Sequence, residues 1–435
     1  MNFAKAWVAS FFPASRKEAS DSIIDNLLLH WFPNKVLKRS FDFSYSFWLG
    51  TVSMSLFLVM AITGIILMFL YVPSVNQAYL SMKDIQYVVS YGWLLRGIHR
   101  MAAHFMVAVV FIHLLRTFYT AAYRNSPKMV KADRRINWLI GIVLLVLTLA
   151  LSYSGYLLPW DQLAYWALVI GSNVAKQAPV IGDTIKSLLI GGTEIGQSAL
   201  LRFYILHCIF LPVLLLLGFF FHMWRIRKDG GLACVDAAIE RAAVQEIEPA
   251  ADKSYTLLGT SDDCAYTVTS STYLDPENQL YANPHLIRRM VWVFALTFAI
   301  TVLFACLLKM PLEAPANPEL VPNPAKAPWY FLWLQELIAD TTIRLGGFTL
   351  NGGFIGGMLI PGVVVGALAV WPYVDSSPPE AIGVWFHPSR RLQNIIFTLI
   401  VLVIIALIYV AAFMRGPNWI LYSPGAVWPS HPPLF

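Results

Sequence analysis

Seven long apolar stretches constrain the fold of this chain more than any other feature of its sequence. They cover residues 45–71, 94–119, 137–157, 199–224, 288–309, 353–373 and 394–414. A helix needs about 20 mostly apolar residues to cross the hydrocarbon core of a bilayer, and each stretch meets that requirement. The chain is therefore predicted to be an all-α polytopic membrane protein with seven transmembrane helices.

The composition agrees with this class and excludes others. Only 13% of the 435 residues are charged, against about 25% in soluble proteins, which excludes a soluble globular domain, a disordered chain and a fibrous repeat. The net charge of +6 is modest and does not indicate a nucleic-acid partner. The four cysteines form no CxxC or CxxCH pattern, so we expect neither a cysteine-based metal site nor a c-type haem attachment.

The basic residues of the loops predict the orientation in the membrane. Lys and Arg accumulate in cytoplasmic loops, and here they cluster between the second and third stretches, after the fourth, and between the sixth and seventh. The N-terminus is therefore expected inside and, after seven crossings, the C-terminus outside. The interrupted apolar segment 162–191 is then expected to form short helices at the outer membrane surface.

The same pattern divides the chain into four parts. Residues 1–44 are a cytoplasmic amphipathic segment, in which 20–32 is predicted to be an interfacial helix because its apolar residues share one face. Residues 45–228 are a four-helix domain, 229–286 a polar cytoplasmic linker, and 287–435 a three-helix domain.

Histidines are spaced regularly within two of the predicted helices. His99 and His113 are 14 residues apart in the second stretch, and His207 and His222 are 15 apart in the fourth. Helical geometry separates each set by about 21–22 Å along the axis and by about 40° or 60° around it. Adjacent helices then offer two imidazole pairs, each suited to the axial positions of a haem iron. His104 lies roughly 140° from His99, and we interpret it as a packing or loop-facing residue.

An alternative is that these histidines are isolated core residues bonded to their neighbours. A single histidine in one span would favour that interpretation. Two helices with matching intervals favour haem binding instead, because each pair supplies both axial ligands at one depth in the membrane.

Glycines repeat at the same interval in two further helices. Gly50 and Gly64 in the first stretch are 14 residues apart, as are Gly141 and Gly155 in the third. Glycine leaves a side-chain-free notch, and a porphyrin edge needs such a notch, so each haem is expected to contact one glycine from each helix. The alternative is close helix packing through small residues, which is common in membranes.

Two arginines flank the histidines. Arg96 precedes His99 by three residues, and Arg116 follows His113 by three. A carboxylate at low dielectric needs a cation or several donors, so both arginines are expected to bind haem propionates. The alternative is that both extend their charged ends to the membrane interface.

Several motifs resemble cytochrome b of the quinol-oxidising cytochrome bc and chloroplast cytochrome b–f complexes. They are GWLLRGIH (92–99), HLLR (113–116), SGYLLPWDQLAYW (154–166), RFYILH (202–207), HMWRIRKDGG (222–231) and FMRGPNW (413–419). The whole chain corresponds to the chloroplast cytochrome subunit joined to its three-helix partner subunit. The resemblance implies a four-helix bundle holding two non-covalent b haems, completed by three further helices.

The resemblance also implies a mechanism and partners. His99 and His207 would ligate the outer haem, and His113 and His222 the inner haem. Quinol would be oxidised at an outer site, with one electron passing to a Rieske iron–sulfur protein and the other through both haems to an inner quinone site. This generates proton motive force. A c-type cytochrome subunit, a homodimer and a bacterial cytoplasmic membrane complete the expectation.

The outer quinol site is expected from two segments that match the family. One is the GYLLPWDQ stretch with its following surface helices, which supplies Tyr156, Pro159 and Trp166. The other is the loop between the fifth and sixth helices, which supplies Tyr330.

The sequence departs from the family within that loop. The family typically has an acid before Trp-Tyr, thought to accept a quinol proton, but this chain has Pro328 there. We predict Glu336 as its replacement, with Asp161 a weaker candidate; the alternative is that Glu336 caps or pairs elsewhere.

A second departure is Trp48 in FWLGT, where chloroplast-type proteins carry a cysteine that tethers an extra haem. No covalent haem is therefore expected.

These inferences predict the catalytic cytochrome b subunit of a quinol–cytochrome c oxidoreductase, or one using a plastocyanin-like acceptor, active only within a complex. One alternative is a dihaem quinone-reactive anchor of a different respiratory enzyme, without Rieske bifurcation. Another is a transporter that only resembles the pattern, which predicts no haem. A reduced-minus-oxidised spectrum tests the last alternative directly.

Overall fold

The computed structural model describes residues 35–125, 133–229, 231–233, 279–346 and 348–425, together with Ser15 and Ala19. Within these residues, seven helical segments are long and apolar enough to cross a membrane, which confirms the predicted number of crossings. The predicted interfacial helix at 20–32 and most of the predicted linker lie outside the described residues.

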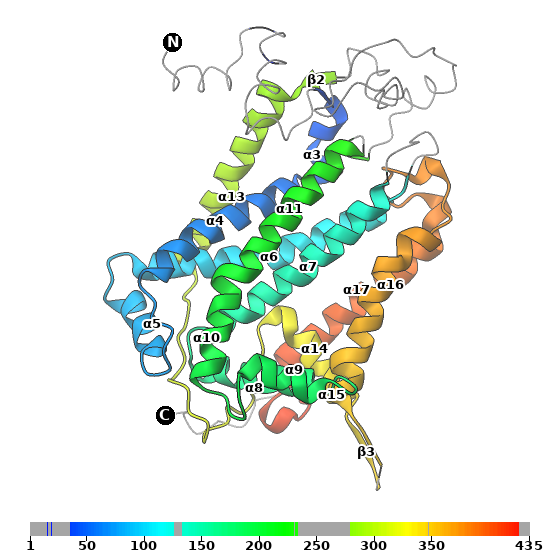
Figure 1. Cartoon of the computed structure of the whole chain (residues 1–435). Helices are drawn as coiled ribbons and strands as arrows, with labels where there is room; N and C mark the ends of the chain where they lie inside the picture. The colour runs from blue at the N-terminus through cyan, green and yellow to red at the C-terminus, as the bar shows by residue number, and fades with distance from the viewer. Residues whose placement is uncertain are drawn as a thin grey trace.

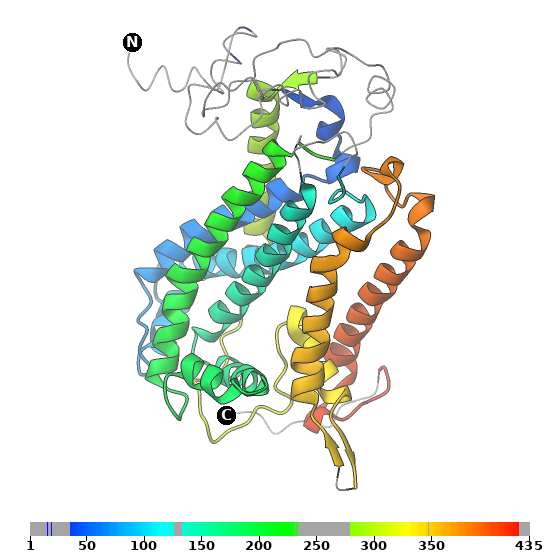
Figure 2. The ribbon, with the colours of Figure 1, turned by 45° about the vertical axis from the view of Figure 1, so that its right-hand side comes forward.

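The first four crossings lie side by side as a slanted bundle (Figures 1 and 2). They are α4 (Leu49–Met68), α6 (Gly92–Tyr119), α7 (Arg134–Leu157) and the continuous series α10 (Gln197–Ile205), η3 (Leu206–Phe210) and α11 (Leu211–Lys228). The remaining crossings are η6 (Ala282–Leu286) with α13 (Ile287–Leu307); α15 (Gly352–Phe354), η7 (Ile355–Leu359) and α16 (Ile360–Val374); and η9 (Pro388–Arg390), α17 (Arg391–Tyr409) and η10 (Val410–Met414).

Short elements distinguish the two ends of the bundle (Figure 1). One end, here called the ribbon end, carries β1 (Lys35–Leu37) paired antiparallel with β2 (Gln279–Tyr281), followed by η2 (Lys38–Phe41) and α3 (Phe43–Ser46). The opposite end, here called the helix-capped end, carries α5 (Ala78–Tyr87), α8 (Gln162–Lys176), α9 (Gly182–Ile190) and α14 (Trp329–Asp340). There the hairpin of β3 (Ile343–Leu345) and β4 (Phe348–Leu350) projects from the bundle (Figures 1 and 2). Two further 3₁₀ turns are η8 (Pro379–Ala381) and η11 (Pro417–Trp419).

The interrupted segment after the third crossing forms two helices, as predicted for 162–191. α8 begins after Asp161, whose carboxylate accepts a hydrogen bond from the Ala164 amide at 2.9 Å, a typical N-cap. α9 ends at Gly191, which adopts the left-handed conformation with φ 77°. Both helices lie across the helix-capped end (Figure 1).

The first crossing begins later than residue 45, where the sequence predicts it. Phe47 and Trp48 both have positive φ, 48° and 52°, and this left-handed pair separates α3 from α4. A continuous right-handed helix excludes such backbone angles. The apolar run therefore includes a short helix that lies outside the crossing itself.

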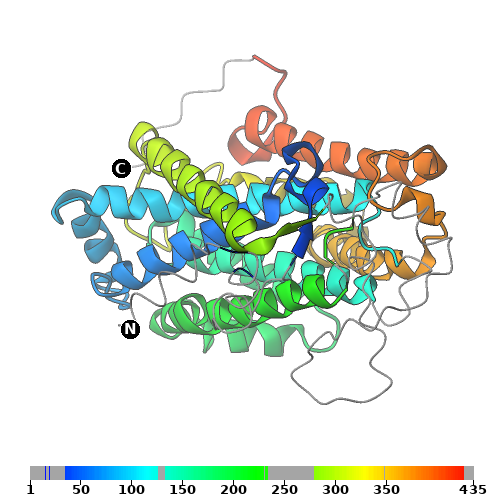
Figure 3. The same cartoon turned by 90° about the horizontal axis from the view of Figure 1, so that it is seen from above.

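The fifth crossing joins the two halves of the chain. α13 crosses α4 and α6 when the bundle is seen from above (Figure 3) and packs against both. Gly97 on α6 allows this approach, because a Cβ there would lie 3.4 Å from both the Cβ and the carbonyl oxygen of Ala305 on α13. Small residues commonly permit such close helix contacts in membranes.

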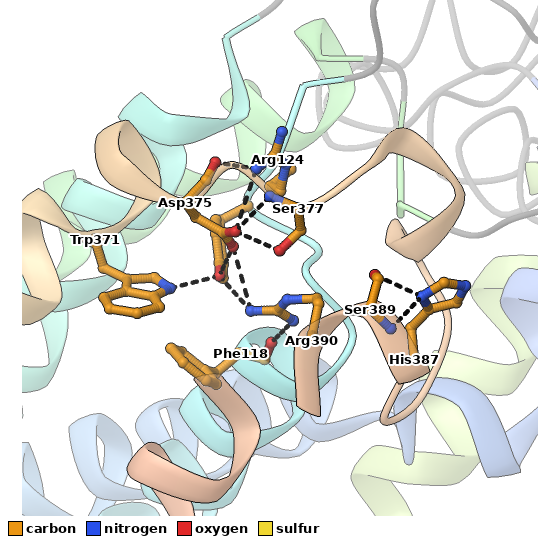
Figure 4. Close-up of polar contacts among 9 residues, drawn as sticks. Phe118, Arg124, Trp371, Asp375, Ser377, His387, Ser389 and Arg390 are labelled. Carbon is orange, nitrogen blue, oxygen red and sulfur yellow. Dashed lines mark hydrogen bonds and ion pairs between the residues drawn. The ribbon is translucent and has the colours of Figure 1, made fainter. Parts of the chain in front are cut away.

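A buried polar cluster joins the sixth and seventh crossings to the end of α6 (Figure 4). The Tyr123 hydroxyl donates to Asp375 Oδ2 at 2.5 Å, and the Arg390 guanidinium lies 3.3 Å from the same carboxylate. Arg390 Nη1 also donates to the Phe118 carbonyl oxygen at 2.6 Å, and Arg124 pairs with Asp375 at 3.3 Å. We call these side chains the Asp375 cluster; Trp371 and Ser377 complete it.

Candidate functional site

The four predicted ligand histidines form two pairs between α6 and the fourth crossing. The ring centroids of His99 and His207 lie 6.3 Å apart, and those of His113 and His222 lie 6.5 Å apart. We call these the first and second pairs. The first lies toward the helix-capped end, because His99 is near the start of α6 and His207 near the start of the fourth crossing.

The spacing of both pairs fits a six-coordinate haem iron. An iron atom held by two imidazole nitrogens at about 2 Å each separates the ring centroids by about 6 Å. Both measured separations match that value. Each pair could therefore bind a haem without a change in the helix positions.

A π-helical turn in the fourth crossing aligns His207 and His222 with the two histidines of α6. The sequence spacing predicts about 40° between His99 and His113 but about 60° between His207 and His222. However, η3 (Leu206–Phe210) is π-helical, so it takes up one more residue than an α-helical turn. The 15-residue interval therefore acts as a 14-residue interval, and both pairs close at similar distances.

Hydroxyl groups fix the tautomer of the first pair. Thr63 Oγ1 donates to the Val59 carbonyl oxygen at 2.7 Å, so its oxygen must accept from His99 Nδ1, 2.9 Å away. Ser154 Oγ likewise donates to a carbonyl oxygen and lies 3.2 Å from His207 Nδ1. With the hydrogen on Nδ1, each Nε2 keeps its lone pair for a metal. Such outer hydrogen bonds are characteristic of ligating histidines.

Two of the predicted glycines lie closely against the first pair. A Cβ built on Gly64 would lie 3.1 Å from His99 Cε1, and one on Gly155 would lie 2.4 Å from His207 Cε1. Both glycines therefore make room for the ligand imidazoles. The notch for a porphyrin edge stays a prediction.

The other two glycines contact the second pair more loosely. A Cβ on Gly50 would lie 3.9 Å from His113 Cε1, and one on Gly141 would lie 3.7 Å from His222 Cε1. Both are ordinary van der Waals distances. Each imidazole thus faces one glycine, from α4 for the histidines of α6 and from α7 for those of the fourth crossing.

This difference predicts opposite outcomes for the same substitution. Gly155→Ala should displace the His207 ring and abolish haem binding at the first pair, because a Cβ at 2.4 Å overlaps the imidazole. Gly50→Ala should leave the His113 ring in place, because its Cβ meets only an ordinary contact with that ring at 3.9 Å. Pyridine-haemochrome content per chain measures both; full haem content in the Gly155 variant contradicts the prediction.

The two predicted propionate arginines differ in their surroundings. Arg116 is buried beside the second pair and lies 4.5 Å over the Tyr45 ring, while its Nη2 has no hydrogen-bond partner among the described residues. A buried unpaired guanidinium nitrogen fits a propionate ligand. Arg96 is also buried but already donates to Gln86 Oε1 at 2.6 Å and to the Met310 carbonyl oxygen at 2.7 Å.

A small cavity of about 60 Å³ lies at the helix-capped end. Tyr156 and Pro159, two of the predicted quinol-site residues, line it together with Arg96, Arg100, Asp161 and Glu313. Ligand pockets usually exceed roughly 300 Å³, so a quinol ring requires movement of side chains here. Burial raises the pKa of the Asp161 carboxyl, which also accepts from the Glu313 amide at 3.3 Å.

The remaining predicted quinol-site residues lie on neighbouring elements of the same end. Trp166 on α8 donates from Nε1 to the Leu320 carbonyl oxygen at 2.9 Å. Tyr330 on α14 is buried, and its ring centroid lies 5.9 Å from that of His104 on α6. The ring centroids of Tyr153, near the end of α7, and Phe331 on α14 lie 6.1 Å apart, so the two predicted segments meet in one region.

Glu336 pairs elsewhere, which is the alternative that the sequence left open. Its carboxylate is fully buried, and Oε1 accepts from Arg415 Nη2 at 2.6 Å and from Nε at 2.8 Å. Oε2 accepts from Trp419 Nε1 at 3.0 Å. Both oxygens are therefore engaged in joining α14 to the segment after the seventh crossing.

Sequence reasoning missed several residues of these sites. Thr63 and Ser154 are small polar residues inside apolar helices, one residue before Gly64 and Gly155 respectively. That shared position was a signal available in the sequence. Arg100 and His104 are polar residues on α6 outside the haem-facing side, and polar groups at membrane depth are usually functional.

Comparison with known proteins identifies relatives of the first half. The family profile Cytochrome b/b6/petB matches residues 35–230. Cytochrome b6 of Cyanidium caldarium is 39% identical over 181 residues, covering 42% of this chain and 81% of that protein. Cytochrome b6 of Acaryochloris marina is 41% identical over 182 residues, covering 42% of this chain and 81% of that protein.

One solved structure extends the similarity to both halves. A chain described as hyperthermophilic respiratory Complex III superposes with a TM-score of 0.66 and 21% sequence identity, covering 90% of this chain and 91% of that chain. At this identity the likeness concerns the fold. The three-helix half, which lies beyond the profile match, therefore has the same arrangement in a second protein.

Proposed function

Since this chain belongs to the cytochrome b/b6 family of haem-binding membrane proteins, we propose that it is the cytochrome b subunit of a membrane quinol oxidoreductase. The observation that carries the proposal is the pair of bis-histidine sites, with ring separations of 6.3 and 6.5 Å. Haem bound at both sites supplies a path for single electrons across the membrane.

The residues of the chain hold and orient these groups. His99 and His207 would ligate the outer haem, and His113 and His222 the inner haem. Thr63 and Ser154 hold His99 and His207 in the tautomer that ligates iron.

Loop charges support the orientation. The ribbon end carries most of the basic loop residues, so we assign it to the cytoplasm, with the N-terminus inside and the C-terminus outside. The helix-capped end then faces outward and holds the quinol oxidation site. We place the protein in a bacterial cytoplasmic membrane, with the four-helix and three-helix domains joined by the cytoplasmic linker 229–286.

We propose that quinol binds at the helix-capped end, which carries Tyr156, Pro159, Trp166 and Tyr330. One electron would pass to a Rieske iron–sulfur protein and the other to the outer haem and on to an inner quinone site. A c-type cytochrome subunit and a second copy of this chain are the further partners. The proton role predicted for Glu336 would require it to leave Arg415, so its contacts favour a structural role.

Purification of the intact complex from native membranes tests the proposal. We expect two b-type components in the reduced-minus-oxidised spectrum, a Rieske signal in electron paramagnetic resonance, and quinol-dependent reduction of cytochrome c. Two b haems without a Rieske signal would indicate the dihaem anchor instead. A preparation that lacks b-type absorbance contradicts both functions and would support the transporter alternative.

A further inference from the structure

His104 is the one histidine of the two haem-binding helices that belongs to neither pair. It lies five residues after His99 on α6, about 7.5 Å along the helix axis. It is half-buried at membrane depth, where a polar group is costly and is usually retained for function. Its imidazole lies beside Tyr330, one of the residues of the proposed quinol site.

The partner of His104 comes from the segment that lacks the family's acid. Trp329 Nε1 donates a hydrogen bond to His104 Nδ1 at 3.1 Å. Trp329 is the first residue of α14 and follows Pro328 directly. Tyr330 packs beside the same imidazole, with ring centroids 5.9 Å apart. His104 therefore faces the very segment in which a proton acceptor is missing.

The hydrogen bond from Trp329 shows which nitrogen of His104 carries no hydrogen and therefore has an acceptor lone pair. An indole N–H can only donate, so His104 Nδ1 must be the acceptor and carries no hydrogen. A quinol hydroxyl is a donor of the same kind. The Trp329 side chain is partly exposed at 39%, which leaves it room to turn away. The indole N–H thus occupies the lone pair to which a bound quinol would donate.

Resting on the proposed function, we propose that His104 is the base that accepts a proton from quinol at the helix-capped end. The quinol O–H bond breaks, its electron pair stays on the oxygen, and the proton forms a bond with Nδ1 as the Trp329 N–H moves off. The products are a quinol anion and an imidazolium. This step moves one proton and no electrons, and later release of the Nδ1 proton to water restores the acceptor lone pair that faces Trp329.

Other titratable groups in the region are less suited to this step. Both oxygens of Glu336 accept hydrogen bonds from Arg415 and Trp419. Asp161 caps α8 and accepts from two backbone amides. Burial raises the pKa of the Tyr330 hydroxyl to about 12, so it remains protonated and acts as a donor. Among these four groups, His104 is the one whose acceptor atom has a single partner, the Trp329 N–H.

Replacing His104 with glutamine in the intact complex tests the assignment. The Gln Oε1 atom can accept the indole N–H, so the contact with Trp329 is kept, but an amide does not take up a proton at neutral pH. We expect turnover to fall about 100-fold or more, the usual contribution of a general base. The KM for quinol and the haem content should remain unchanged. His387→Gln, at a half-buried histidine of the opposite end, serves as the matched control and should behave as wild type.

Several outcomes would overturn the assignment. Near wild-type turnover in His104→Gln removes His104 as a base, and a loss of haem or a large rise in KM assigns it a structural role. If His104→Gln does not assemble, the test uses His104→Ala with added imidazole. If added imidazole does not restore turnover of that variant, His104 is excluded as the base. Wild-type complex that does not oxidise quinol refutes the proposed function itself, so the two failures are distinguishable.

Discussion

Inserting one alanine after Cys208 is expected to remove one of the two proposed b haems. The insertion makes the interval between His207 and His222 two residues longer than the 14 that separate the histidines of α6. The π-helical turn η3 accommodates one extra residue, so the second is left over. One surplus residue rotates one part of the helix by about 100° relative to the other, which turns one histidine away from its partner.

Deleting Cys208 provides the matched control. The interval becomes 14 residues, equal to that of α6, and the segment can continue as a regular α-helix without the π-helical turn. Both haems should remain bound. Haem per polypeptide and the b-type spectrum measure both variants. If the insertion kept both haems, or the deletion lost one, the role assigned to η3 would be wrong.

Asp375→Asn is expected to destabilise the protein by about 3–5 kcal/mol, the usual cost of breaking a buried ion pair by removing one partner. The Asp375 and Arg390 side chains are both fully buried, and Arg124 shares the same carboxylate (Figure 4). The asparagine keeps the shape of the aspartate but leaves two cations without their anion. Those cations lie where the sixth and seventh crossings join α6.

Asp183→Asn is the control for this substitution. Asp183 pairs with Lys176 at 3.1 Å on the surface, where its side chain is 86% exposed. Exposed ion pairs contribute about 0–1 kcal/mol, so the control should unfold close to the wild-type temperature. Thermal unfolding of the purified protein, followed by loss of the haem absorbance, compares the two; equal midpoints for both variants would refute the assigned role.

The effect of Asp375→Asn should also depend on pH in one direction. Burial by itself raises the pKa of Asp375, but hydrogen bonds from Ser377 and Tyr123 bring that pKa below its usual value. A lowered pKa in the folded state means that the carboxylate stabilises the fold above the unfolded pKa of about 3.9. The difference in the free energy of unfolding between Asp375→Asn and wild type should therefore be constant between pH 6 and 8. It should diminish only as the pH falls below about 4.

The crossings and the histidine pairs could be predicted from the sequence because both follow from local periodicity. An apolar stretch long enough to cross the membrane predicts a transmembrane helix. A fixed interval on a helix predicts which residues share a face. The two helices within 162–191 were predictable for the same reason. The late start of α4 was not, because Phe47 and Trp48 are ordinary apolar residues whose left-handed conformation is not encoded in hydropathy.

Contacts between distant segments account for most of what the sequence did not predict. The bond between His104 and Trp329 joins residues 225 positions apart, and the pairing of Glu336 with Arg415 joins residues 79 positions apart. Helical angles placed His104 off the haem-facing side without identifying its partner. The π-helical turn was not predicted either: the 15-residue interval between His207 and His222 shows one extra residue but not the backbone conformation that accommodates it.

Pairing of β1 with β2 is delayed during synthesis of the chain. Lys35 pairs with Tyr281, so β1 leaves the ribosome long before its partner strand exists. At a synthesis rate of about 5–20 residues per second, β1 waits on the order of 10–50 s while the next four crossings enter the bilayer. The first half of the chain therefore passes through the translocon with an unpaired strand, and its closure marks the arrival of the second half.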